Sequence, residues 1–133
     1  MSGLSVTAPM GVLATTTPPY FGVCPQYTTR EQRVLWELHQ SVVRALRHDP
    51  ERVLRLVPHN IAVTRTHVHG PLAQRWMDEW QQAAEQGAEN LVALCELPGS
   101  HGDDLRQVGP FMGVLSQPER IAAIKRAAKP AGR

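Results

Sequence analysis

The chain has 133 residues, of which 42% are hydrophobic and 20% are charged, and its formal net charge at pH 7 is +2. This length fits one domain and this composition is ordinary for a soluble globular protein, and no apolar run approaches the ~18 residues that span a bilayer. The two cysteines, Cys24 and Cys95, are too few and too far apart for a disulfide framework or a zinc site. We therefore expect a cytoplasmic protein.

The charges are unevenly distributed along the chain. Residues 30–65 carry seven basic and four acidic side chains, residues 66–104 carry one basic and seven acidic, and residues 105–133 carry six basic and one acidic. An acidic middle between basic flanks can neutralise itself inside a folded bundle, or it can present faces of opposite sign to partners. Composition leaves both alternatives open.

The N-terminal segment, residues 1–28, contains no charged side chain and is rich in Thr, Pro, Gly and Ser. It shows no sustained helical or strand period, and it lacks the basic start and long apolar stretch of a secretory signal. We expect a flexible or partner-ordered tail. The folded domain is predicted to cover residues 29–129.

The first predicted helix begins at Thr28, because Thr28 and Glu31 have the spacing of a capping box. Apolar residues then recur at helical spacing as far as Leu46. Asp49 and Pro50 supply a cap and a favourable first position for a second helix.

The second predicted helix contains Pro58, which predicts a kink or a break near Val57. A third helix should begin after Gly70 and end at Gly87, with Trp76 and Trp80 on its inward stripe.

A fourth, shorter helix is expected over about residues 89–97. The polar sequence SHGDD at residues 100–104 predicts a loop, followed by at most one helical turn. Ser116 and Glu119 form a second capping-box pattern, with Pro118 in the first turn of a last helix. No strand-like alternation of useful length occurs. The sequence therefore predicts an all-α fold, a compact bundle of five or six short helices.

No catalytic constellation is evident. His67 and His69 are two positions apart, which on a helix points them to different faces, and no HExxH or CxxC pattern accompanies them. No glycine-rich loop has the form of a phosphate-binding motif. Cys95 lies within an apolar helical run and is expected in the core. We expect neither an enzyme nor a bound metal or cofactor.

The segment at residues 107–118 carries no charge and is strongly apolar. A solvated segment of this kind would form an apolar patch typical of an interaction site. We expect instead that Phe111 and Leu115 fold inward and hold the last helix against the helix of the two predicted core tryptophans. Arg106 and Gln107 would then bond to loop carbonyls or to a partner. Docking to a partner is the open alternative for this segment.

The sequence LRQVGPFMGVLSQPER, at residues 105–120, resembles the closing segment of small helical antitoxins from bacterial toxin–antitoxin operons. The resemblance extends over about residues 30–128. It also includes Leu38-His39, Asp49-Pro50 with Val53-Leu54, Asn60-Ile61, and Trp76 with Glu79-Trp80.

This resemblance implies an antitoxin that neutralises a cognate toxin, of the zeta kinase or nucleotidyltransferase type, by direct binding. If the toxin is a kinase, its nucleotide site should be basic, and an acidic stretch of the chain could face that site and imitate phosphate; this stretch comprises Asp78, Glu79, Glu85 and Glu89. Equally, the basic first helix could pair through Arg44 and Arg47 with acidic residues of the toxin. The candidate partner-binding residues are Arg44, Arg47, Trp76, Asp78, Glu79, Arg106, Gln107 and Phe111.

The alternative function is that of a DNA-binding regulator of its own operon, with basic clusters that contact the phosphates of DNA. The acidic middle of the chain would oppose such binding.

Overall fold

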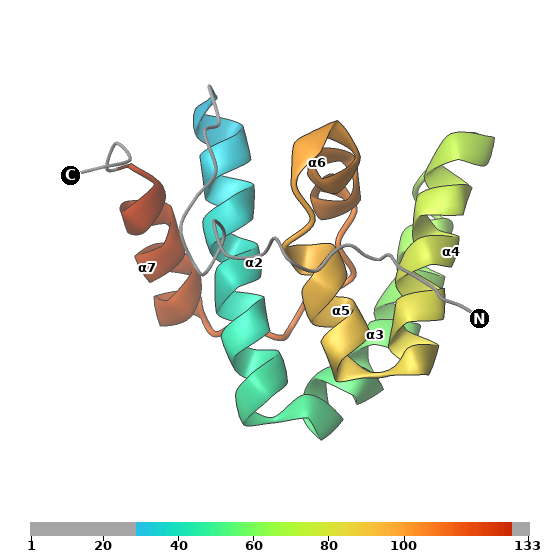
Figure 1. Cartoon of the computed structure of the whole chain (residues 1–133), viewed down its shortest axis with the longest axis horizontal. Helices are drawn as coiled ribbons and strands as arrows, with labels where there is room; N and C mark the ends of the chain where they lie inside the picture. The colour runs from blue at the N-terminus through green and yellow to red at the C-terminus, as the bar shows by residue number, and fades with distance from the viewer. Residues whose placement is uncertain (1–28, 129–133) are drawn as a thin grey trace, which may run out of the picture.

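A computed structural model describes residues 29–128, and within them the fold is all-α, with no strand (Figure 1). The six helices are α2 (Arg30–His48), α3 (Pro50–Arg65), α4 (Pro71–Gln86), α5 (Ala88–Cys95), α6 (Gly99–Gln107) and α7 (Gln117–Ala127). The predicted all-α bundle is thus confirmed, while the predicted tail at residues 1–28 lies outside the described residues. Within the described residues, none of the helices is both long and apolar enough to cross a bilayer.

Two helices begin with capping boxes. The α2 cap is Thr29, whose hydroxyl accepts a hydrogen bond from the Gln32 N–H (3.1 Å), while the Gln32 side-chain oxygen accepts one from the Thr29 N–H (3.3 Å). The predicted cap at Thr28 is therefore one residue too early. The predicted box at Ser116 and Glu119 is confirmed, and hydrogen bonds from Ser116 lower the pKa of the Glu119 carboxyl.

Helix α3 continues through Pro58, so of the two alternatives predicted near Val57, a kink or a break, the break does not occur. Proline has no N–H to donate to the carbonyl four residues earlier, and its ring disfavours a helix interior by about 3 kcal/mol. Against this, α3 buries Val53, Val57 and Ile61 almost completely. Burying each such side chain contributes about 1.5–3 kcal/mol, so the buried face outweighs the proline. Pro58 itself lies on the exposed side of the helix.

The predicted polar loop at residues 100–104 is instead part of helix α6. Gly102 is buried, and a Cβ atom at this position would overlap the main-chain carbonyl of Leu97. The absence of a side chain therefore lets α6 pack directly onto the connection that follows α5. This tertiary contact stabilises a helix whose sequence, rich in Gly, Ser and Asp, has low intrinsic helix propensity.

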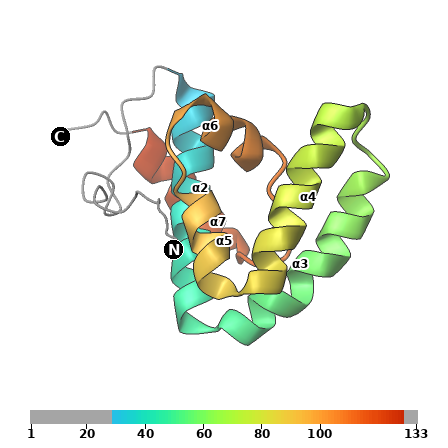
Figure 2. The same ribbon diagram turned by 45° about the vertical axis from the view of Figure 1, so that its right-hand side comes forward.

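Helix α2 packs against α3, α5, α6 and α7, and Figure 2 shows it on the left of the molecule, beside α5 and α6. Helix α7 packs mainly against α2, through the buried Ala123 and Ala127. Polar contacts also tie these helices together: Arg33 Nε donates to the Ala127 carbonyl (3.1 Å), and Arg126 donates to Glu37 Oε1 (2.9 Å) and to the Ser41 hydroxyl (2.8 Å). The expectation that the last helix packs on the tryptophan helix, α4, is wrong, because α7 and α4 lie at opposite sides of the molecule (Figure 1).

Three rings form a cluster in the core, which we call the ring cluster: His39, Trp80 and Phe111. The Phe111 ring meets the Trp80 ring edge-on at 5.1 Å and the His39 ring at 5.6 Å. The Trp80 indole N–H donates to the Leu105 carbonyl (3.0 Å). Phe111 is 8% exposed and Leu115 packs partly buried against the core, so the expectation that both fold inward is confirmed.

Polar contacts hold the α6–α7 connection against α3. The Asn60 amide donates to the carbonyls of Pro110 (3.1 Å) and Met112 (2.8 Å), and Arg52 Nη2 donates to the Val114 carbonyl (3.0 Å). Asn60 is itself buried. A buried amide that satisfies two loop carbonyls explains how this uncharged connection keeps its backbone paired away from water.

Candidate protein-binding surface

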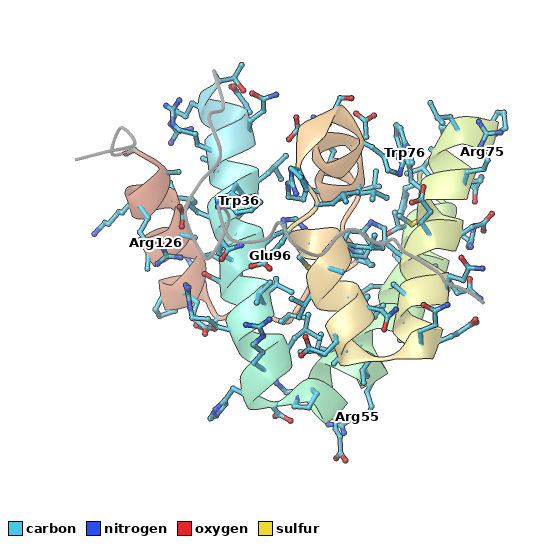
Figure 3. All side chains as sticks on the ribbon, in the orientation of Figure 1. Trp36, Arg55, Arg75, Trp76, Glu96 and Arg126 are labelled. Atoms are coloured by element: carbon cyan, nitrogen blue, oxygen red, sulfur yellow. The ribbon has the colours of Figure 1, made fainter. Side chains whose placement is uncertain are left out.

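A groove of about 600 Å³ lies between α4 and α6, and we call it the α4–α6 groove. Figure 3 shows Trp76 between the two helices at this end of the molecule, with Arg75 beside it on α4. Helix α4 supplies most of the lining and α6 supplies His101 and Asp104. Both helices are positioned by the core, since α4 buries Trp80 and α6 buries Leu105 behind the groove.

The groove is acidic. Its charged lining comprises four carboxylates, one arginine and one histidine: Asp78, Glu79, Glu85, Asp104, Arg75 and His101. Glu79 Oε1 lies 2.9 Å from His101 Nε2, a contact that links α4 to α6 across the groove. Asp78 Oδ1 lies 2.7 Å from Nη2 of Arg65 on α3. Most of this charge is open to solvent, so it can attract a basic partner.

Apolar side chains lie among these charges. Leu72 is 51% exposed and Trp76 is half-buried, and both line the groove from one face of α4, four residues apart. Tryptophan is among the residues that contribute most to protein–protein binding, because a large rigid ring is desolvated at small conformational cost. An exposed leucine beside a half-buried tryptophan, surrounded by carboxylates, has the composition of a binding surface for a basic segment with apolar residues.

The structure separates the predicted partner-binding residues. Those that line the α4–α6 groove are Trp76, Asp78 and Glu79. Arg44 and Arg47 are exposed on α2, where Arg47 lies 3.8 Å from Glu89, so they belong to a different surface. Gln107 is exposed at the end of α6, whereas Phe111 is buried in the ring cluster.

Arg106, predicted to bond to loop carbonyls or to a partner, is 2% exposed and bonds inside the protein. Its Nη1 donates to the carbonyls of Cys95 (3.0 Å) and Leu97 (2.8 Å), and its Nη2 lies 3.0 Å from Asp103 Oδ1. The guanidinium also lies over the Trp36 ring, 5.1 Å from its centroid. The guanidinium therefore joins α2, α5 and α6, and in this structure it is not available to a partner.

Several groove residues were not predicted from the sequence, notably Leu72, His101 and Asp104, whereas Glu85 belongs to the predicted acidic stretch. The spacing of Leu72 and Trp76 is a helical i, i+4 signal that was available. His101 and Asp104 have i, i+3 spacing, but that spacing has meaning only on a helix, and this segment was expected to be a loop.

His39 is a buried histidine with one unpartnered nitrogen. Its Nδ1 lies 2.8 Å from the Leu35 carbonyl, which can only accept, so Nδ1 carries the proton and Nε2 is a bare acceptor. Nε2 has no hydrogen-bond partner and faces Gly109, where a Cβ atom would collide with it. Burial lowers the pKa of His39 from 6.5 to about 4. The neutral ring is therefore built into the core.

This burial predicts a dependence of stability on pH. The unfolded chain binds a proton at His39 near pH 6.5 and the folded chain only near pH 4, so His39 stabilises the fold fully above pH 6.5 and loses this contribution as the pH falls to 4. A difference of this size corresponds to about 3 kcal/mol. In urea titrations from pH 7 to 4, His39→Gln should lose less stability than the wild type. The control variant is His59→Gln, at an exposed position, and its stability should depend on pH as that of the wild type does. If the free energy of unfolding falls equally with pH in all three proteins, His39 is not the source of this pH dependence.

A second groove and a buried cysteine in the described region are weaker candidates for a binding surface. A groove of about 500 Å³ between α3 and α4 is lined mainly by apolar residues such as Leu54, Pro58 and Ala84, without a cluster of charge. Cys95 is buried, as expected, and burial raises the pKa of its thiol. Among residues 29–128, no group of three His, Cys, Asp or Glu side chains lies close enough to hold a metal ion.

In comparisons with known proteins, no family model, no curated protein and no solved structure matches the chain.

Proposed function

We propose that this protein is an antitoxin that neutralises a cognate toxin by direct binding, without catalysis of its own, and that the α4–α6 groove is the surface that meets the toxin. The observation that carries the proposal is the composition of this groove: four carboxylates around a half-buried tryptophan and an exposed leucine. The resemblance of residues 105–120 to helical antitoxins supports it independently.

The charge of the groove favours a toxin with a basic active site. Sites that bind nucleotides are lined by lysine, arginine and helix N-termini, because these groups stabilise phosphate. The carboxylates of Asp78, Glu79 and Asp104 would pair with these basic groups as phosphate does. A zeta-type kinase fits this description, and steric occlusion of its nucleotide site would inactivate it.

Co-expression with the product of the neighbouring gene tests the function. The neighbour should arrest growth when expressed alone, and this protein should restore growth and co-purify with it. A harmless neighbour, or one that stays toxic in the presence of this protein, would refute the antitoxin proposal. Salt-sensitive binding to the promoter of its own operon, without neutralisation of the neighbour, would support the DNA-binding alternative.

Charge reversal tests the surface. The variant Asp78→Lys with Glu85→Lys should slow association with the toxin about tenfold or more at low salt, with a smaller effect at high salt. The matched control, Glu31→Lys with Glu51→Lys, makes the same charge change at exposed positions outside the groove and should change the association rate far less. Equal rates for the two variants, measured by stopped-flow or biosensor methods, would place the toxin on another surface.

A further inference from the structure

The outer face of α7 is both apolar and basic. Ile121 is 45% exposed and Ile124 is 38% exposed, and Arg120 and Lys125 are exposed beside them. At about 100° per residue, the four side chains spread over about 140° of the helix circumference, and the two isoleucines lie between Arg120 and Lys125. The adjoining side of α7 rests on α2 through Ala123 and Ala127. The helix therefore leaves its larger apolar side chains on the solvent side.

This face is complementary to the α4–α6 groove in charge, polarity and length. The groove offers carboxylates around Leu72 and Trp76, and α7 offers an arginine and a lysine around two isoleucines. At 1.5 Å per residue, α7 is about 16 Å long, and the α4 segment from Leu72 to Glu85 spans about 20 Å. Laying an amphipathic helix into an apolar groove with complementary charges is a common form of protein recognition.

The two surfaces lie on opposite sides of one molecule, with α7 and α4 at the two ends of the row of helices in Figure 1. They therefore cannot meet within one chain. We infer that α7 of one copy docks in the α4–α6 groove of a second copy, so that the protein associates head to tail with itself. Such an interface is heterologous, since it joins two different surfaces, and each added copy leaves one groove and one α7 free.

The contact is expected to be weak, because one short helix in a shallow groove buries an area at the low end for protein interfaces. The inference needs only the groove and α7, so it does not depend on the toxin. If the proposed function is also correct, self-association and toxin binding compete for one groove, and a reservoir of associated protein releases free grooves on dilution.

Sedimentation velocity of the full chain tests the inference. The weight-average mass should exceed that of a monomer at concentrations on the order of 100 µM in low salt, and it should fall towards the monomer as salt rises above physiological strength. The groove variant Asp78→Lys with Glu85→Lys should be monomeric, and so should the α7 variant Arg120→Glu with Lys125→Glu, because each places like charges against one another.

Mixing the two variants provides the decisive result. The unchanged α7 of the groove variant meets the unchanged groove of the α7 variant, so an equimolar mixture should associate although neither variant does alone. A monomeric mixture, a wild type that is monomeric under all conditions, or variants that associate as the wild type does would each overturn the inference. Circular dichroism of each variant confirms that the substitutions leave the fold intact.

Discussion

Replacing Phe111 with alanine should lower the free energy of unfolding by about 3–5 kcal/mol. The ring is 8% exposed and packs edge-on against Trp80 at 5.1 Å and His39 at 5.6 Å, so the substitution removes both contacts and opens a cavity in the core. A loss of this size is a large fraction of the 5–15 kcal/mol stability of a typical domain. The isolated protein should therefore melt at a markedly lower temperature.

Met112 provides the matched control for this experiment. It follows Phe111 in the same connection, yet it is 73% exposed, so Met112→Ala should change stability by less than about 0.5 kcal/mol. Urea titration of both variants measures the difference. Equal stabilities for Phe111→Ala and the wild type would contradict the buried position and would instead favour this connection as a docking surface.

Arg106→Ala should also destabilise the fold strongly, by about 3–5 kcal/mol, as is usual when one member of a buried charged network is removed. The carbonyls of Cys95 and Leu97 would lose a charged donor, and Asp103 would lose the guanidinium 3.0 Å away. Arg106→Lys should recover only part of the loss, because an ammonium group cannot reproduce the planar fork that reaches all three acceptors.

Arg44 is the control for charge. It is exposed on α2 and donates to Ser41 (3.0 Å), so Arg44→Ala should cost less than about 1 kcal/mol in the same denaturation experiment. Similar losses for Arg44→Ala and Arg106→Ala would show that the buried network contributes no more than a surface side chain.

The sequence predicted those parts of the fold that are decided by local chemistry. The start of α7 follows from hydrogen bonds between Ser116 and Glu119, and the inward position of Trp80 follows from helical spacing. Helix α6 and the unbroken α3 could not be predicted in this way, because long-range packing decides them. Gly102 stabilises α6 only when the Leu97 carbonyl is beside it, and Pro58 is tolerated only because the far side of α3 is buried.

The candidate binding surface was predicted in part for the same reason. Trp76, Asp78 and Glu79 are neighbours on one helix, so their proximity follows from sequence. His101 and Asp104 join them only through the packing of α6 beside α4. Arg106 has the charge of a surface residue, and its burial depends on carbonyls at the end of α5 and in the connection that follows it.

The separation of charge between the two ends of this molecule gives it an electric dipole, even though the net charge is only +2. In the field of a charged object a dipole rotates before it touches, so the acidic α4 side would turn towards a positive surface and α7 towards a negative one. At physiological ionic strength the electric field is screened over about 8 Å, so the molecule rotates only when the two surfaces are already close to each other. Of all the orientations in which two molecules can collide, those that present the matching end are thereby enriched. The arrangement of charges thus determines which face of the protein meets a partner, before any side chains are in contact.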